Sequence, residues 1–377
     1  MELKAGYKMT EVGVIPKDWE VKSFGDLTEK IIGGGTPSRS NSIFWGNEIP
    51  WVTVKDFATF NRCQTQEYIT KEGLKNSASH LIPKGIIITS TRMALGKAVI
   101  YNIDVSINQD LKAIFPKKFI DTKFLYYWFE FYSKFIADLG SGSTVMGLSL
   151  ADLRKILVKV PRKSEQTAIA TALSDADALI SSLEKLIAKK RNIKQGAMQK
   201  LLQPKEGWEV KRLGEVLSIK HGRDQKNVQS QSGLYPILGT GGLMGYSTKF
   251  LYNKESVLIG RKGTIDKPKY MNTPFWTVDT LFYSEIKENY SSKYIYYIFL
   301  MIDWYLYNEA SGVPSLNART IENIESNFPI YLEQIKIANI LSDMDEEITA
   351  LEYKLEKYRN IKFGMMQNLL TGKIRLV

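Results

Sequence analysis

The chain contains one long segment twice. Residues 173–202 read LSDADALISSLEKLIAKKRNIKQGAMQKLL, and residues 341–370 read LSDMDEEITALEYKLEKYRNIKFGMMQNLL. At an offset of 168 residues, 17 of these 30 positions are identical without a gap. A repeat of this length indicates an architecture built from two copies of one unit. We therefore expect two like surfaces, which bind either two like partners or a target with two halves.

Shorter matches extend the repeat over the rest of the chain. Three segments recur in order: Pro16–Lys22 as Pro204–Lys211, Phe24–Leu27 as Leu213–Val216, and Phe124–Phe129 as Tyr294–Phe299. Between these anchors the two halves differ strongly. The repeat predicts variable domains at residues 1–162 and 204–330, and nearly constant helices at residues 163–203 and 331–377.

The variable domains have the pattern of mixed α+β structure. Short β-like runs at residues 85–89 and 256–259 are bounded by turn-forming residues. An aromatic helix is expected near the end of each domain, at residues 124–131 and 294–305, and its rings fit a core better than a base-stacking surface. The predicted fold class is therefore α+β, with two globular domains separated by two long helices in a pseudo-two-fold repeat.

The constant segments predict a seam between two helices. Apolar residues alternate in steps of three and four, which is the spacing of a coiled coil. Two like helices in one chain pack most simply on each other, antiparallel, and a helix near 40 residues long could hold two domains a fixed distance apart. The expected seam residues are Leu173, Ala176, Ile180, Leu183 and Ile187, then Leu341, Met344, Ile348, Leu351 and Leu355.

Two features interrupt these helices. Lys190 and Lys194 break the first seam, so we expect Ile193, Ala197 and Leu201 to continue an apolar face in a shifted phase. Gly196 and Gly364 stand in mid-helix, where glycine costs about 1 kcal/mol against alanine. Their presence in both copies suggests either a close helix crossing or the docking of another protein.

Composition narrows the class of protein. The 377 residues are 44% hydrophobic, which fits a folded chain of two or more domains. No long apolar run or signal peptide is evident, and the single cysteine, Cys63, suits a reducing cytoplasm. The formal charge of +11 suggests a polyanionic partner, although solubility alone is the simpler explanation.

The motifs of several enzyme classes are missing. The sequence has no Walker A phosphate loop and no proline pair of the kind found in amino-methyltransferase loops. His80 and His221 have no evident nucleophile beside them, and with one cysteine they cannot form an ordinary zinc site. We expect a protein that recognises a target and catalyses nothing itself, without a bound metal or cofactor.

In the order of its motifs the chain resembles the specificity subunit of type I restriction-modification enzymes. The resemblance covers nearly the whole chain, and the two copies of the repeated helix are its most specific feature. The shorter landmarks are Tyr7–Val21, Gly34–Ser38, Ile49–Val52, Ser90–Arg92, Asn108–Gln109, Gly142–Thr144, Gly239–Gly242, Gly260–Gly263, Trp276–Thr280 and Ser311–Asn317. One departure is Asp110, which stands where glycine is expected.

The resemblance implies a division of labour among several proteins. Each variable domain would be a target-recognition domain that reads one half of a split double-stranded DNA sequence, while the helices set the gap and dock two methyltransferase subunits. Those partners would bind S-adenosylmethionine and methylate adenine. Motor-nuclease subunits, which use ATP and Mg, would cut unmethylated DNA. The chain would be a cytoplasmic, non-catalytic subunit that binds none of these cofactors and no membrane.

Reading DNA requires hydrogen-bond donors in a groove and cations on phosphates. Arg92 and Arg261 follow β-like runs at matching places and are expected to be equivalent; a role in pinning a loop is as plausible as DNA contact. For Ser90 and Thr144, turn formation is the simpler role. The candidates are Arg39, Lys55, Ser90, Arg92, Lys97, Asn108, Gln109 and Thr144 in the first domain, and Lys220, His221, Arg223, Lys226, Thr240, Arg261, Lys262, Lys267 and Ser311 in the second.

Two other classes remain open at this point. A stand-alone DNA-binding regulator with a split site would bind tightly without a methyltransferase. A protein scaffold would bind two protein copies and show salt-dependent DNA binding without sequence preference. A methyltransferase fused into this chain is the least favoured class, because its motifs are missing.

Overall fold

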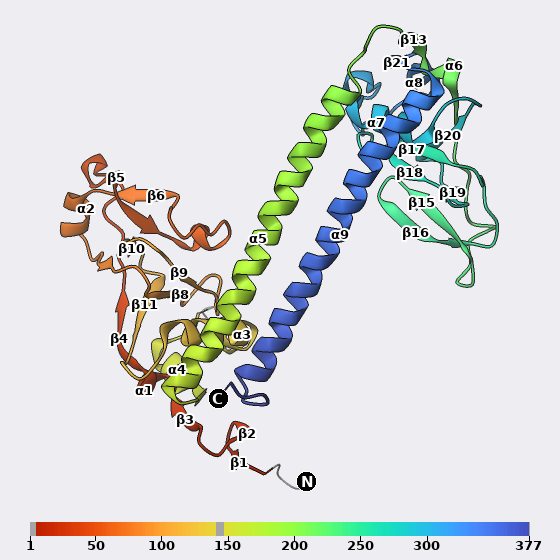
Figure 1. The fold of residues 1–377 in the computed structure, drawn as a ribbon. Coiled ribbons are helices and arrows are strands. Elements are labelled where there is room, and N and C mark those ends of the chain that lie inside the picture. Colours follow the sequence, from red (N-terminus) through yellow and green to blue (C-terminus); the bar gives the residue numbers. More distant parts are fainter. Residues whose placement is uncertain (1–4, 141–146, 377) are drawn as a thin grey trace. The chain divides into compact units, whose positions relative to one another are not determined.

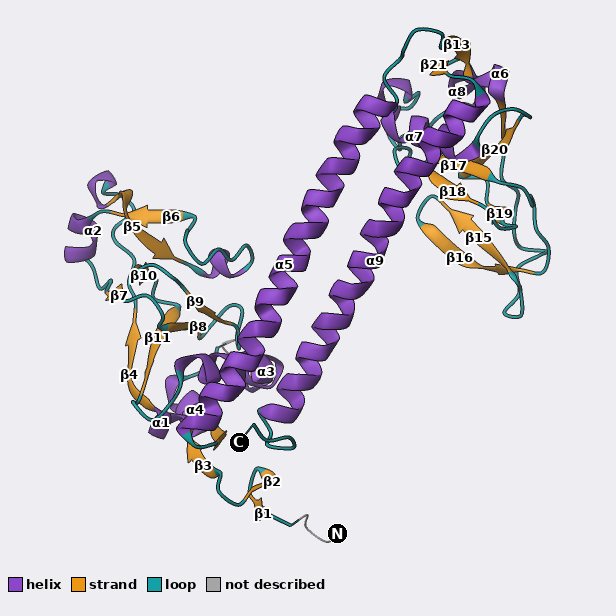
Figure 2. Ribbon diagram, viewed as in Figure 1, coloured by secondary structure: helices purple, strands orange, loops and turns teal. Residues whose placement is uncertain are grey.

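The computed structural model describes residues 5–140 and 147–376, and its contacts divide the chain into two compact units. Unit 1 contains residues 1–183 and 354–377, and unit 2 contains residues 184–353. The division falls within both long helices, so each unit holds one variable domain together with half of each helix (Figures 1 and 2).

In unit 1, the variable domain contains two four-stranded sheets. The first has the antiparallel order β4-β11-β8-β9 and the second the order β6-β5-β10-β7, in which β5 and β10 are parallel. Their strands are β4 (Thr28–Gly33), β5 (Trp45–Val52), β6 (Glu67–Ile69), β7 (Leu81–Ile82), β8 (Ile87–Ser90), β9 (Ala98–Ile100), β10 (Val105–Ile107) and β11 (Leu111–Pro116).

Shorter elements complete unit 1. Strand β3 (Glu20–Ser23) pairs with β12 (Leu157–Val160), and β1 (Tyr7–Thr10) with β2 (Gly13–Pro16). The helices are α1 (Phe24–Leu27), η1 (Ser42–Phe44), η2 (Val54–Phe57), α2 (Lys71–Lys75), α3 (Thr122–Gly140) and α4 (Leu150–Lys155). Helix α3 buries Phe124, Leu125 and Phe129 in the core, so the expected core role of the aromatic stripe is confirmed.

Unit 2 repeats the topology with shorter elements. Its sheets have the orders β14-β20-β17-β18, antiparallel, and β16-β15-β19, in which β15 and β19 are parallel. These strands are β14 (Leu217–Lys220), β15 (Tyr235–Gly239), β16 (Gly242–Ser247), β17 (Ser256–Gly260), β18 (Lys269–Met271), β19 (Trp276–Thr277) and β20 (Leu281–Ile286).

The remaining elements of unit 2 also match unit 1. Strand β13 (Glu209–Arg212) pairs with β21 (Glu325–Phe328), as β3 pairs with β12. The helices are α6 (Leu213–Val216), α7 (Ser292–Met301), η3 (Trp304–Tyr307) and α8 (Ala318–Glu322). Helix α7 buries Tyr294, Ile295 and Phe299, so it corresponds to α3 in position and in role.

Helices α5 (Lys163–Leu201) and α9 (Tyr331–Leu369) are the two repeated segments. Each begins two residues after a proline, which disfavours helix at the residue before it. The first turns are fixed alike: the Gln166 side-chain amide donates to Pro161 O at 2.9 Å, and that of Gln334 donates to Pro329 O at 2.9 Å. Both helices begin where the sequence predicts.

Within each unit the two helices run antiparallel. In unit 2, Arg191 pairs with Glu352 at 2.5 Å and Lys194, later on α5, pairs with Asp345, earlier on α9. In unit 1, Leu173 packs in one cluster with Met366, and Asp177 pairs with Lys362 at 2.7 Å. The expected seam residues are buried or half-buried at all ten positions.

Of the three residues expected to continue an apolar face after Ile187, Ala197 and Leu201 are half-buried and pack against the core of unit 2. The prediction for Ile193 is wrong, because that side chain is 47% exposed. Lys190 and Lys194 are half-buried and continue the three-four spacing, so the seam does not change phase. In the second copy Ile361 is exposed and Lys362 is buried in the same way. The lysines are therefore seam residues, which apolar periodicity alone could not reveal.

No helix within residues 5–140 and 147–376 is long and apolar enough to cross a membrane. In the same part of the chain, no group of three or more His, Cys, Asp or Glu side chains comes together as a metal site.

Candidate nucleic-acid interface

In the second domain, the loops that leave the strands are tied to one another by backbone hydrogen bonds. Arg223 N donates to Thr277 O at 2.8 Å, and the Trp276 indole donates to Arg223 O at 2.9 Å. Val278 N donates to Leu238 O at 3.0 Å. These bonds hold the segments after β14, β15 and β19 at one end of the domain.

The loop after β17 joins the same cluster. Arg261 N donates to Thr280 O at 2.8 Å, and Leu316 N donates to Arg261 O at 2.9 Å. The Arg261 guanidinium forms an ion pair with Asp279 and keeps 27% of its side chain exposed. Lys262, the next residue, is exposed. The loop therefore presents one cation that is already paired and one that faces solvent.

A small pocket lies within this cluster. It has a volume of about 290 Å³ and is lined by His221, Arg261 and Lys262 together with the later loop residues Ser315 and Asn317. The His221 ring stands edge-on to Phe282, with 4.8 Å between centroids. Ser315 and Asn317 were not among the predicted site residues, although both belong to the Ser311–Asn317 landmark.

The other candidates of the second domain differ in their surroundings. Arg223, Lys226, Lys267 and Ser311 are exposed. Thr240 packs beside Gly260 and Gly263, whose added Cβ atoms would lie 3.1 and 3.5 Å from its side chain. Lys220 forms an ion pair with Glu285 on the neighbouring strand, at 3.5 Å.

In the first domain the corresponding loops are tied together in the same way. Gly35 N donates to Ile107 O at 3.0 Å, and Asn108 N donates to Val52 O at 3.0 Å. A Cβ on Gly34 would lie 1.9 Å from Ile107 O, and one on Gly222 in unit 2 would lie 2.1 Å from Val278 O. Both domains thus need glycine where the chain leaving the first strand of the main sheet crosses another strand end.

Arg39 is the most constrained cation of the first domain. Its guanidinium makes two hydrogen bonds to the Glu67 carboxylate, at 2.7 and 2.9 Å, and lies 3.7 Å from the centre of the Trp45 ring. The hydrogen bond to Glu67 raises the pKa of Arg39, and its counterpart lowers the pKa of Glu67. The planar cation is held in place by a carboxylate and a ring, with about half of its side chain still exposed.

Four further candidates of this domain are exposed. Arg92 lies 3.7 Å from Asp110 and is 68% exposed, and Lys55 and Lys97 also face solvent. The Gln109 side-chain oxygen accepts a hydrogen bond from the Thr36 hydroxyl. The cations are available to a polyanion, while the amide of Gln109 is oriented by its neighbour.

Two candidates of the first domain are buried. Ser90 is 2% exposed at the end of β8. Asn108 is 8% exposed, and its side-chain oxygen accepts from Asp110 N at 3.2 Å, so it forms a turn. Neither side chain is presented on the surface of the domain. Thr144 and the Gly142–Thr144 landmark lie outside the described residues.

Asp110 does not need the backbone freedom of glycine. Among the described non-glycine residues, only Ala94 and Asn289 have a positive φ angle. The side chain of Asp110 contributes to the loop, because it faces Arg92 and accepts weakly from the Asn108 amide at 3.3 Å. The departure from the expected glycine therefore leaves the loop intact.

The expected equivalence of Arg92 and Arg261 is off by one residue. In the strand register Ser90 lies opposite Leu111, and Gly260 lies opposite Leu281, so Ser90 and Gly260 correspond. Arg261 then corresponds to Thr91, and Arg92 corresponds to Lys262. The two domains place different side chains on one loop framework.

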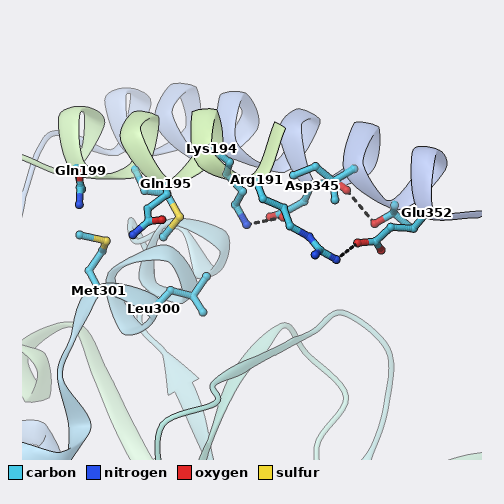
Figure 3. A pocket seen from close by; sticks show the side chains of 11 residues that line it. Arg191, Lys194, Gln195, Gln199, Leu300, Met301, Asp345 and Glu352 are labelled. Carbon is cyan, nitrogen blue, oxygen red and sulfur yellow. Dashed lines mark hydrogen bonds and ion pairs between the residues drawn. The ribbon is translucent and has the colours of Figure 1, made fainter. Parts of the chain in front are cut away.

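A second surface lies on the helices of unit 2. A pocket of about 670 Å³ is bordered by Lys194, Gln195 and Gln199 of α5, Asp345 of α9, and Leu300 and Met301 of α7 (Figure 3). Beside it, a Cβ on Gly196 would meet no described atom within 4 Å, and the same is true of Gly364 in unit 1. A close helix crossing therefore does not explain these glycines.

The family model of the type I restriction modification DNA specificity domain matches residues 16–195 and again residues 205–357. The chain belongs to this family. The two matches follow the internal repeat, and the chain is accordingly a type I specificity subunit with two copies of the domain.

Individual relatives support the assignment over the full length. The chain is similar to the type I restriction enzyme MjaIX specificity subunit of Methanocaldococcus jannaschii, with 26% identity over 98% of this chain and 96% of the relative. Two solved structures share the fold. One is the type I restriction-modification S subunit from M. genitalium, with a TM-score of 0.66, 17% identity, and 98% of each chain covered. The other, from work on complex assembly and conformational transition of the type I R-M system, has a TM-score of 0.57, 13% identity, and covers 96% of this chain and 99% of its own.

Proposed function

We propose that the specificity subunit reads a split double-stranded DNA sequence, with one half read by each variable domain. The observation that carries the proposal is the repeated loop framework with different side chains at corresponding positions. Thr91 and Gln109 in the first domain correspond to Arg261 and Asp279 in the second. An unchanged framework with changed hydrogen-bonding groups is what two different half-sequences require.

The cations on these loops have the properties of phosphate and base-edge contacts. Arg92, Lys97, Arg223 and Lys262 are exposed on loops that are fixed by backbone hydrogen bonds. Phosphate contacts position a protein on DNA, and side chains at base edges specify the sequence. We assign positioning to the exposed lysines and sequence reading to the arginines and to the pocket of His221, Ser315 and Asn317.

We further propose that helices α5 and α9 set the gap between the two half-sequences. Helix α5 has 39 residues. At 1.5 Å per residue it is about 58 Å long, which matches about 17 base pairs of DNA. The gap follows from the helices because each recognition domain is joined to them directly along the chain.

The exposed faces around Gly196 and Gly364 are proposed as docking sites for two methyltransferase subunits. The glycines stand at matching positions of the two copies, weaken each helix, and leave open space beside the backbone. Two like surfaces fit two copies of one partner. S-adenosylmethionine would be bound by that partner, ATP and Mg by motor-nuclease subunits, and neither by this chain. The single, exposed Cys63 fits a cytoplasmic location.

The test is a map of modified adenines in cells that express this chain with its neighbouring methyltransferase, compared with cells that lack this chain. We expect one new motif with two short halves and a fixed gap. No new motif, with the methyltransferase expressed and bound, would contradict the reading role. Failure to bind the methyltransferase, with tight and sequence-specific DNA binding by the chain alone, would favour a stand-alone regulator. DNA binding without sequence preference would favour a scaffold.

A further inference from the structure

In each helix pair, one seam lysine has a largely covered ammonium-bearing side chain. The side chain of Lys194 on α5 is 16% exposed, and that of Lys362 on α9 is 11% exposed. The two residues are 168 positions apart, so they occupy the same place in the two copies. Burying an ammonium group is costly unless it is paired and hydrogen-bonded. Its presence in both copies therefore calls for partners.

An aspartate and a tyrosine face the lysine in both units, and Lys362 has Glu130 of α3, at 2.6 Å, as an additional carboxylate. In unit 2, Lys194 forms an ion pair with Asp345 of α9, and the Tyr297 hydroxyl of α7 donates to the same carboxylate at 2.8 Å. In unit 1, Lys362 pairs with Asp177 of α5 at 2.7 Å, and the Tyr127 hydroxyl of α3 donates to that carboxylate at 2.7 Å. The lysine also lies 5.5 Å from the Tyr297 ring centre in unit 2, and 5.3 Å from that of Tyr127 in unit 1.

Each carboxylate thus joins three elements. It receives a cation from the opposite long helix and a hydroxyl from the aromatic helix of the recognition domain. Burial contributes to raising the pKa of both tyrosines, and the hydrogen-bonded carboxylate acts in the same direction, so each hydroxyl remains a donor. The geometry ties α5, α9 and one recognition domain together at a single point in each unit.

Apolar seams do not define such a point by themselves. A heptad pattern repeats every seven residues, so a slip of seven residues, about 10 Å along the helix, restores most apolar contacts. In unit 2, a slip in one direction carries Lys194 from Asp345 towards Ala338, which is 1% exposed among apolar neighbours, so the ammonium would be buried without a carboxylate. A slip in the opposite direction carries Lys194 towards Glu352. In both cases Asp345 and the Tyr297 hydroxyl bound to it lose their cation. Buried polar groups are known to specify register in this way.

We propose that Lys194–Asp345–Tyr297 and Lys362–Asp177–Tyr127 are register locks, which allow one alignment of α5 on α9 and fix each recognition domain to that alignment. Insofar as the locks set the DNA gap, the inference rests on the proposed function. These six side chains are positioning residues for sequence reading, although none lies on the loops assigned to DNA.

The first experiment reads the helix register directly by cysteine cross-linking with a short bismaleimide. Cys63 is replaced by serine, and cysteine pairs are introduced in unit 2. Positions 190 and 347 mark the native register, because the Lys190 and Glu347 side chains meet tip to tip, with Nζ 2.7 Å from Oε1, and the reagent replaces that length between two cysteines. Positions 190 and 340 mark the seven-residue slip that carries Lys194 towards Ala338. Each pair is tested with the locks intact, and with Lys194→Met, Asp345→Leu, Lys362→Met, Asp177→Leu and Glu130→Gln combined. Both locks are changed because each helix runs through both units.

With intact locks we expect cross-linking of the 190/347 pair alone. Without them the 190/340 pair should also cross-link, at least tenfold above its level in the locked chain. Native cross-linking alone, in a variant of unchanged helix content, would overturn the proposal. If the combined variant does not fold, Lys194→Asp is compared with the charge swap Lys194→Asp plus Asp345→Lys. The swap must restore the native pattern that the single variant loses, and a single variant that keeps that pattern would also refute the lock.

The second experiment connects the register to DNA through the adenine map. If the unaltered chain gives no split motif, the proposed function fails, while cysteine cross-linking still tests the locks. If it gives one split motif, the unlocked chain should methylate the same half-sequences with an additional gap, shifted by about 3 base pairs for a 10 Å slip. An unchanged single gap, together with altered cross-linking, would show that the locks act on the helices without determining DNA spacing.

Discussion

The two copies of the lock have the same centre and different surroundings. In unit 1, Lys362 has a second carboxylate, Glu130, at 2.6 Å, and the Phe131 and Phe363 rings lie 6.4 Å apart nearby. In unit 2, Leu300 stands at the place of Glu130, Met301 at that of Phe131, and Gln195 at that of Phe363. There the side chains border the pocket of about 670 Å³ (Figure 3).

The comparison shows that the two copies share the lysine, the aspartate and the tyrosine of the lock, and differ in the side chains around them. These three residues are the same in both copies because the loss of any one of them would leave a buried charge without compensation and destabilise the fold. The surrounding side chains differ because they lie at the rim, where solvent can replace a missing contact. The surface around the lock can therefore differ between the two copies as long as the helix alignment is kept.

The largest expected effect is an unequal loss from the two lysines. Lys362→Met leaves two carboxylates without their cation and should destabilise unit 1 by about 3 kcal/mol, whereas Lys194→Met leaves one and should cost unit 2 about 2 kcal/mol. Amide hydrogen exchange of α3 and α7 measures each unit separately, which global unfolding of a two-unit chain does not. Equal losses would indicate that Glu130 contributes nothing to the lock.

The next comparison concerns the cation over the first tryptophan of each unit. Arg375 pairs with Glu165, whose side chain is 1% exposed, at 2.6 Å, and with Asp18 at 2.8 Å. In unit 2, Lys205 reaches Glu333 at 3.4 Å in an exposed setting. Arg375→Gln should cost about 2 kcal/mol, and Lys205→Gln less than about 0.5 kcal/mol. Amide hydrogen exchange around Trp19 and Trp208 measures the two losses of stability separately. A larger loss from Lys205→Gln than from Arg375→Gln would contradict the prediction.

Arg92 and Lys262 occupy equivalent loop positions in the two domains. Substituting each of them tests whether equivalent positions make the same kind of DNA contact. Arg92→Ala should weaken binding by about 1–3 kcal/mol and relax one position in its own half-sequence only, as expected of a base contact. Lys262→Ala should weaken binding uniformly across all sequences and reduce the salt slope, as expected of a phosphate contact. The same kind of loss from both variants would contradict this division. Ser90→Ala, at a buried position, serves as the control and should leave the motif unchanged.

The mid-helix glycines should respond equally in the two copies. Gly196→Ala and Gly364→Ala should each stabilise the free subunit by about 1 kcal/mol, because the added methyl group meets open space. Gly196→Trp and Gly364→Trp should each remove one methyltransferase from the assembly, as measured by its mass in solution. Full binding of both copies by either tryptophan variant would place the docking surfaces elsewhere.

The smallest effect expected is a dependence on acid that is confined to unit 1. The hydrogen bond from Arg375 is the main cause that lowers the pKa of Asp18 below its usual value. The resulting stability is present above the ordinary carboxyl pKa of about 3.9, and is lost as the pH falls through the lowered value. Exchange around Trp19 should therefore increase below about pH 4 more than in Asp18→Asn. Gly207 stands at the corresponding place in unit 2, so no matching change is expected there.

The repeat, the two long helices, the order of the domains and the family could be predicted from the amino-acid sequence alone. These features depend on local periodicity and on identity between the two copies, and both can be read from the amino-acid sequence. The core role of the aromatic helices and the ten seam positions also followed, because apolar spacing decides which face of a helix is buried.

The positions of the polar residues depend on tertiary contacts. The sequence predicts that Lys194 breaks the seam, but Lys194 lies in the seam because Asp345 and Tyr297, more than 100 residues away, supply its partners. Ser90 and Asn108 have the chemistry of DNA contacts but are buried, and strand register moved the match of Arg92 from Arg261 to Lys262. The burial of a polar group depends on partners that folding brings together, and the spacing of apolar residues along the sequence does not predict those partners.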